Sequence, residues 1–125
     1  MQQSLSWSFN AGTTGGHGVN AGGALTVDAV FSASIVLDAN MAQMKDVALQ
    51  IDDVDKLNLL VISSSLNDGK VELKADGSAV TMITGPLVLF GNAAKLFAGD
   101  LEKISLQNKS ADKTADISIL IGLAL

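Results

Sequence analysis

The chain has 125 residues, 48% of them hydrophobic, a formal net charge of −5, and no arginine or cysteine. An acidic chain without arginine argues against nucleic-acid binding, which needs a basic surface for phosphate contacts. The lack of cysteine excludes a disulfide framework and thiolate metal sites, and is typical of proteins made in a reducing cytoplasm.

The length and hydropathy predict one domain spanning residues 1–125, large enough to bury a core without covalent staples. No basic segment followed by an apolar stretch opens the chain, and no apolar run approaches the roughly 18 residues of a membrane span. We therefore expect no secretory signal and no membrane partner. The high hydrophobic content also predicts apolar surface that an oligomer or assembly covers.

The first predicted element is a short strand at residues 4–10, where Leu5, Trp7 and Phe9 alternate with serines. Six glycines follow within residues 11–23. This glycine-rich segment predicts a flexible or extended loop, or an arm that a partner orders. Its candidate interface residues are Gly15, Gly16, His17 and Val19.

Two motif matches in the same segment are weak. Residues 16–21 spell G-x-G-x-x-A, but the dinucleotide fingerprint needs a helix next, and a period-two pattern follows instead. His17 is the only histidine, so it has no second histidine for a metal site and no oriented partner for a catalytic triad. We expect no cofactor and no metal.

The clearest strand pattern runs over residues 24–38, where apolar and polar side chains alternate, with room for a bend or bulge in the middle. A connection at 39–46 leads to alternation at 47–51 and a polar turn or short 3₁₀ segment at 52–56. The continuous apolar run Leu57–Ile62 predicts a central strand buried on both faces.

The second half of the chain reads as short strands separated by turn residues. Asn67-Asp68-Gly69 is a strong hairpin signal because the tight turn needs positive φ. Further turns are expected at 75–78, 85–86 and 108–113, with a loop or one helical turn at 92–99. The remaining strands are expected at 71–73, 80–84, 87–90, 101–106 and 117–125.

Eight to ten short strands without an amphipathic helix predict an all-β fold. We expect an antiparallel β-sandwich of jelly-roll or Greek-key type.

Acidic residues do not form a convincing catalytic or metal motif. Asp52, Asp53 and Asp55 are close together, but the order of ligands in a calcium loop is missing, so a capping turn is the better interpretation. Glu72 and Glu102 interrupt strand patterns as solvent-facing residues do. We therefore predict that the chain is not an enzyme.

The last segment stays apolar to its final residue, whereas chain ends are usually polar and frayed. This predicts either a central strand or an intersubunit strand, and the sequence leaves both open. The candidate interface residues here are Ile119, Ile121, Leu123 and Leu125.

Several segments resemble small β-sandwich capsid decoration (cement) proteins of tailed bacteriophages. They are LQIDDVDKLNLLVIS at 49–63, GPLVL at 85–89, and DLEKISLQN at 100–108 followed by ADISI at 115–119. The resemblance covers residues 47–121 and rests on structural rather than catalytic motifs. The glycine-rich segment departs from the family pattern.

The resemblance implies a structural virion protein on the capsid exterior, synthesised in the host cytoplasm. The resemblance also implies a homotrimer that binds the major capsid protein and bridges capsid subunits. Two alternatives remain: a tail, baseplate or fibre-associated β-domain, and a free β-sandwich that binds a sugar or calcium.

Overall fold

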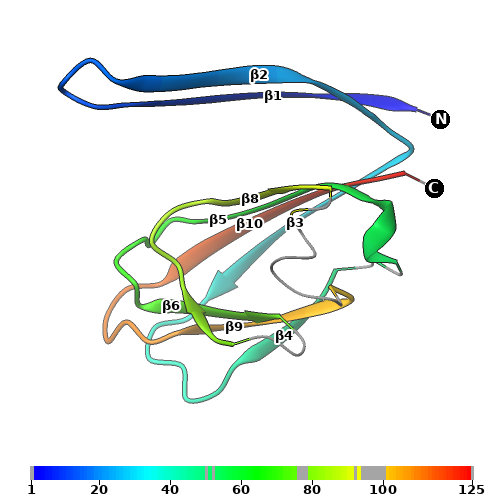
Figure 1. The fold of residues 1–125 in the computed structure, drawn as a ribbon. Helices are drawn as coiled ribbons and strands as arrows, with labels where there is room; N and C mark the ends of the chain where they lie inside the picture. The colour runs from blue at the N-terminus through cyan, green and yellow to red at the C-terminus, as the bar shows by residue number, and fades with distance from the viewer. Residues whose placement is uncertain are drawn as a thin grey trace.

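Two antiparallel four-stranded sheets lie face to face in a computed structural model of the chain, with a separate two-stranded hairpin above them (Figure 1). The structure describes residues 2–49, 51, 53–75, 79–91, 93 and 101–124.

The hairpin and the two sheets take up nearly all of the regular structure. The hairpin consists of β1 (Gln3–Gly12) and β2 (Gly18–Val27). The sheet nearest to it, in spatial order, contains β3 (Ala29–Leu37), β10 (Ala115–Leu123), β5 (Leu57–Ser64) and β8 (Leu87–Phe90). The far sheet contains β4 (Lys45–Ala48), β9 (Lys103–Asn108), β6 (Val71–Ala75) and β7 (Thr81–Met82). The short 3₁₀ helix η1 (Val54–Lys56) precedes β5.

The strand order is that of a jelly roll. From β3 to β10 the chain passes from one sheet to the other at every connection except β6 to β7, and neighbouring strands are antiparallel. Two four-stranded sheets wound in this way form the double Greek key of jelly-roll domains. The prediction of an all-β antiparallel sandwich is confirmed.

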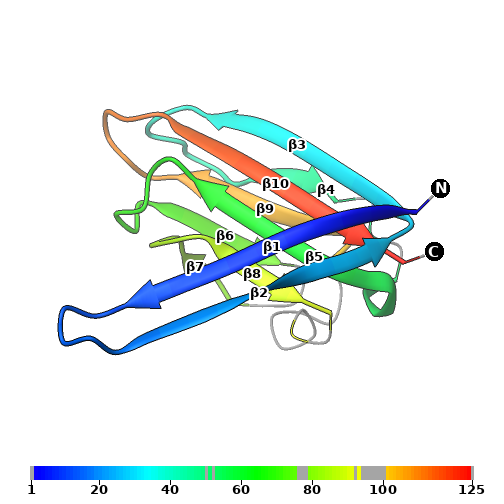
Figure 2. The same ribbon diagram turned by 90° about the horizontal axis from the view of Figure 1, so that it is seen from above.

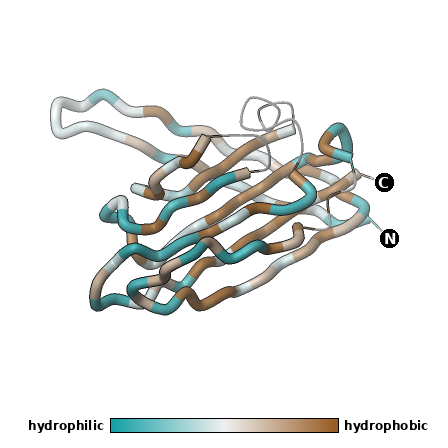
Figure 3. Tube along the Cα trace, turned by 90° about the horizontal axis from the view of Figure 1, so that it is seen from below, coloured by the Kyte–Doolittle hydropathy of each residue, from teal (hydrophilic) through white to brown (hydrophobic). Residues whose placement is uncertain are grey.

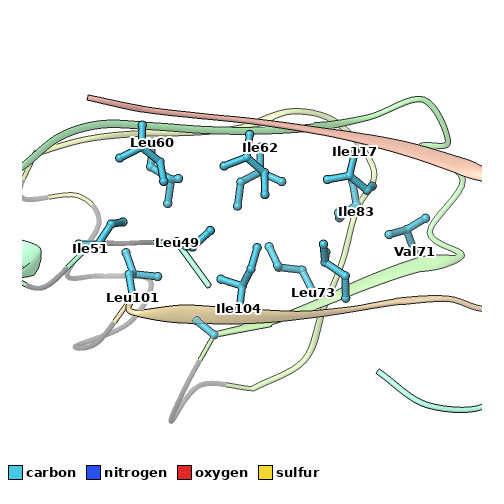
Figure 4. Packing of buried hydrophobic residues seen from close by; sticks show 14 of the residues in the cluster. Leu49, Ile51, Leu60, Ile62, Val71, Leu73, Ile83, Leu101, Ile104 and Ile117 are labelled. Atoms are coloured by element: carbon cyan, nitrogen blue, oxygen red, sulfur yellow. The ribbon is translucent and has the colours of Figure 1, made fainter. Parts of the chain in front are cut away.

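The core fills the space between the sheets with aliphatic side chains (Figure 4). Period-two alternation places every second residue of a strand on the inner face. In β10 these residues are Ile117, Ile119 and Ile121, each at most 2% exposed. Leu60 and Ile62 of β5 face Ile104 of β9 from the opposite sheet (Figure 4).

One buried polar side chain ties the loops at one end of the sandwich together. The Asn108 amide nitrogen donates to the carbonyl oxygens of Leu37 (3.3 Å) and Lys113 (2.8 Å). Its carbonyl oxygen accepts from the Ser110 N–H (3.0 Å). Because a buried amide must find partners, this network specifies how β9, β3 and the turn before β10 meet.

The sequence predicted a flexible or extended loop, or a partner-ordered arm, at residues 11–23; in the structure this segment forms the end of β1, the turn and most of β2 of a β-hairpin. Its turn lies at the tip, where Gly16 has φ +88°, a conformation that favours glycine. The small residues of β2 leave room for the large side chains of β1 across the ladder. The predicted strand at 24–38 is also divided, at Asp28: the first part pairs with β1 and the second with β10.

The hairpin predicted at Asn67-Asp68-Gly69 is wrong, although the turn itself forms with Gly69 at φ +85°. The strands on either side, β5 and β6, belong to different sheets. Turn residues satisfy the local backbone but do not specify which sheet the chain joins next. Gly85-Pro86 likewise connects strands of different sheets.

Other predictions hold or lie outside the described residues. Leu57–Ile62 lies in β5, which pairs with β10 and β8 and is a central strand as expected. The 3₁₀ segment is η1, where Asp53 caps the helix by accepting from the Asp55 N–H (2.9 Å). Most of the predicted turn at 75–78 and of the loop at 92–99 falls outside the described residues.

Candidate functional site: a projecting hairpin above an apolar sheet face

The β1–β2 hairpin, residues 3–27, is here called the arm. Its strands pair with each other from Gln3↔Val27 to Gly12↔Gly18 and form a sheet of their own. Figures 1 and 2 show the arm crossing above the sheet that contains β8, β5 and β10, with its tip extending past the end of the sandwich. The arm therefore is an addition to the jelly roll and not one of its layers.

The root of the arm is seated on Gly122 of β10. A Cβ atom at this glycine would lie 2.7 Å from Leu5 Cδ1 and 3.1 Å from Val27 Cγ1, so a side chain here would have to displace Leu5. Beside this contact, the Asp28 N–H donates to the Leu123 carbonyl oxygen (2.8 Å). These contacts fix the point at which the arm leaves the sandwich.

The middle of the arm is held by an aromatic contact. The rings of Trp7 in β1 and Phe90 in β8 have centroids 4.7 Å apart and planes at 59°, a tilted arrangement that aromatic pairs favour. Across the hairpin ladder, Trp7 lies opposite Gly23, where a Cβ would lie 3.3 Å from the indole ring. Gly23 of β2 therefore makes room for the indole ring of Trp7, which lies on the neighbouring strand β1.

An apolar cleft of about 680 Å³ lies between the arm and the sheet. No charged residue lines it. The arm contributes its side from β1 and β2, and the sheet contributes outward-facing side chains of β5, β8 and β10. The large apolar side chains among the lining residues are Trp7, Phe9, Leu59, Val61, Val88, Phe90 and Leu120.

The distal part of the arm is bare and uncharged. Phe9 is 54% and Val19 60% exposed. The tip is closed by backbone bonds between Thr13 and His17: the Thr13 N–H donates to the His17 carbonyl oxygen (2.7 Å). No Asp, Glu, Lys or Arg occurs between Gln3 and Val27. Figure 3 shows the pale tip of the arm extending beyond the brown strands of the sandwich.

The four interface candidates in the glycine-rich segment all lie on this surface. Gly15, Gly16 and His17 are in or beside the tip turn, and Val19 is the second residue of β2; all are exposed. The structure therefore brings them together at one end of the molecule, as residues available to a partner.

The candidates near the C-terminus lie elsewhere. Because β10 pairs with both β3 and β5, it is a central strand, one of the two alternatives left open by the sequence. Ile119 and Ile121 are buried in the core, at 2% and 0% exposure, and Leu123 is half-buried. Leu125 lies outside the described residues. Packing in the core of the chain therefore explains why Ile119 and Ile121 are apolar, without an intersubunit contact.

The sequence predicted that Leu57–Ile62 of β5 is buried on both faces, but it did not predict that the outer faces of β8 and β10 extend this apolar surface. Its signal was present: Leu57–Ile62 and Leu87–Phe90 are apolar at nearly every position, so both faces of these strands need cover. The core covers one face and the arm partly covers the other.

Within the described residues, no cluster of three or more histidine or acidic side chains could hold a metal ion. The same part of the chain contains no helix long and apolar enough to cross a membrane. Comparison of the sequence and structure with protein-family models, curated proteins and solved structures found no match.

Proposed function

We propose that this chain is a structural virion protein, a capsid decoration protein that binds the outside of a tailed-phage head and bridges capsid subunits. The observation that carries the proposal is the arm: an uncharged two-stranded ribbon that is anchored on a rigid sandwich and presents a bare tip. Together with the resemblance of residues 47–121 to decoration proteins, the arm favours attachment over catalysis.

The arm has the properties of an attachment element. Both of its strands are edge strands, because the hairpin joins neither sheet, so each offers backbone donors and acceptors to a neighbouring chain. A two-stranded ribbon alone is only marginally stable in water, and a partner strand would stabilise it. Because the arm carries no Asp, Glu, Lys or Arg, its burial avoids the large desolvation cost of burying ionic side chains.

The rest of the chain, unlike the arm, carries the charged side chains. All of the charged side chains that give the net −5 lie outside residues 3–27 of the arm. A charged body keeps a densely decorated particle soluble while the neutral arm is buried. Several copies would engage the major capsid protein together through their arms, and linked contacts raise the effective affinity about a hundredfold or more.

The test uses heads of the phage that encodes the chain, assembled without this protein, and measures co-sedimentation of the purified chain with them. We expect saturable binding. Val19→Asp, at the arm, should lower occupancy about tenfold, because it places a charge in the buried contact. Val80→Asp is the matched control, since Val80 is 48% exposed but lies on the sandwich.

Absence of the protein from purified particles, together with failure to bind heads, would overturn the proposal. Assembly into rings or tubes without heads would favour the tail or fibre alternative. Equal loss of binding in the two valine variants would show that the arm is not the attachment element.

The apolar cleft supports a second candidate, a free β-sandwich that binds a small ligand such as a sugar. Its volume is in the range of ligand sites, and Trp7 and Phe9 offer aromatic surface to a ligand. A ligand that binds the folded chain raises its melting temperature. A panel of neutral sugars that leaves the melting temperature unchanged would count against this candidate.

A further inference from the structure

The free edge of β3 is unlike the other sheet edges. The jelly roll has four edge strands, and three are short: β4, β7 and β8 have four, two and four residues. In addition, β4 carries Lys45 and Asp46, and Pro86 precedes β8. These are the features by which proteins prevent edge-to-edge pairing.

By contrast, β3 has nine residues, Ala29–Leu37, and none is charged. It pairs only with β10 among the described strands. Phe31 and Ile35 pack against the core but are only half-buried, and Val36 is 62% exposed on the opposite face. A long, uncharged and apolar edge invites pairing with another chain.

The sequence of β3 is nearly the same in both directions. Val30-Phe31-Ser32-Ala33-Ser34-Ile35-Val36 reads, from Ala33 outward, serine on both sides, then Phe or Ile, then valine. A contact between identical copies around a twofold axis requires a self-complementary surface, in which residue i meets j and j meets i. An antiparallel strand pair centred on Ala33 meets this requirement.

We propose that β3 is a homodimer interface, in which the β3 strands of two copies pair antiparallel about Ala33 and join the two sheets into one. Val30 then lies opposite Val36 of the second copy, and Phe31 lies opposite Ile35. Aromatic–β-branched and valine–valine pairs of this kind stabilise antiparallel sheets. The half-buried Phe31 and Ile35 become covered on the core side of the seam.

Alternative registers are worse. Moving the centre to Ser32 or Ser34 keeps the core faces aligned, but places valine opposite serine and shortens the paired segment. Moving it by half a step aligns the core face of one copy with the outer face of the other. The register centred on Ala33 is therefore the one in which like side chains meet along the whole strand.

The same register opposes Asp28 of one copy to Asp38 of the other at both ends of the seam. These like charges weaken the dimer and limit pairing to the strand between them. Salt weakens the repulsion between these carboxylates, so the dimer should not weaken as the NaCl concentration rises. A dimer held by surface ion pairs would weaken instead.

The first test is the solution mass of the isolated chain, by light scattering over a range of concentrations. We expect a reversible dimer of twice the 12.8 kDa chain mass. Val36→Lys should weaken dimerisation about tenfold or more, because each dimer contains the substitution twice. Met82→Lys is the matched control: Met82 is also 62% exposed, but on the edge strand β7, and its replacement should leave the dimer unchanged.

The second test uses the absence of cysteine in the chain. With Ala33→Cys, the two thiols meet at the twofold axis and should form a disulfide-linked dimer under mild oxidation. With Val36→Cys, the two thiols lie six residues apart along the seam, roughly 20 Å, and should not link in spite of their greater exposure.

A monomer at every concentration, a trimer in place of a dimer, or equal cross-linking of the two cysteine variants would overturn the inference. The inference does not rest on the proposed function, because these measurements need only the isolated chain. Failure to bind phage heads would leave the β3 dimer standing.

Discussion

The contact between Trp7 and Phe90 allows the position of the arm to be followed directly. The chain has one tryptophan and no tyrosine, so its indole fluorescence comes from the arm alone. Phe90→Ala removes the ring 4.7 Å from the indole and leaves the seat of Leu5 on Gly122 in place. We expect the middle of the arm to move away from the sheet while the sandwich stays folded.

The free energy of arm docking that Phe90→Ala removes can be worked out from the partial burial of the Trp7–Phe90 pair. An aromatic pair contributes about 0.5–1.5 kcal/mol beyond the area that it buries. Phe90 is already 36% exposed, so its truncation loses less than the roughly 1.5–3 kcal/mol of a fully buried side chain. We therefore expect Phe90→Ala to weaken docking of the arm by about 1–2 kcal/mol. This loss lowers the ratio of docked to undocked arm about tenfold.

The assay compares tryptophan emission and acrylamide quenching with far-UV circular dichroism during urea unfolding. In Phe90→Ala, emission should shift to longer wavelength and quenching should rise in the absence of urea, while the dichroism midpoint changes little. Phe31→Ala is the matched control, because Phe31 packs on the core side of β3. It should lower the stability of the sandwich without altering the emission of the folded protein. Unchanged quenching in Phe90→Ala would refute the docking of Trp7 on Phe90.

Three further substitutions test the core, the loop network and the arm seat. Ile121→Ala should lower the free energy of unfolding by about 3–4 kcal/mol in urea titration, since it removes three buried carbons and leaves a cavity, whereas Ser118→Ala on the outer face should change it by less than about 0.5 kcal/mol. A change in solution mass without loss of stability in Ile121→Ala would contradict its place in the core. Asn108→Ala should cost about 2–3 kcal/mol in the same titration, because three backbone groups lose their partner; a near-neutral result would show that water replaces the side chain. Gly122→Val should displace Leu5, and increased quenching of the arm tryptophan in the folded protein checks this; unchanged quenching would mean that the root repacks.

Local patterns were sufficient to predict most of the strands. Alternation at Leu5, Trp7 and Phe9 predicted β1, and the apolar run at Leu57–Ile62 predicted a central strand. Both patterns depend on the geometry of extended backbone, in which successive side chains point to opposite faces. This property does not require knowledge of the neighbouring strand.

The errors have a common physical origin in long-range pairing. The glycines of residues 11–23 have little preference of their own, and β2 forms because β1 lies beside it. The turn at Asn67-Asp68-Gly69 has the predicted chemistry, but the strands beyond it separate because each buries its apolar face in a different sheet. The turn residues stabilise the local backbone about equally whether the turn joins two strands of one sheet or strands of different sheets.

For the candidate interfaces, the sequence could identify the residues but not their environment. An apolar C-terminal segment suits a central strand and an intersubunit strand equally well, and the positions of β3 and β5 on either side of β10 decide between them. His17 and Val19 are exposed because the arm carries them past the sandwich, which no local pattern indicates.

By itself, therefore, the sequence determined the all-β class, the location of most strands and the side chains that face inward, because period two is a property of each strand alone. The tertiary structure decided the sheet to which each strand belongs, the seating of the arm on Gly122 and the exposure of the β3 edge. These features depend on contacts between residues far apart in the chain, where the burial of apolar surface selects one arrangement among many that the local pattern allows.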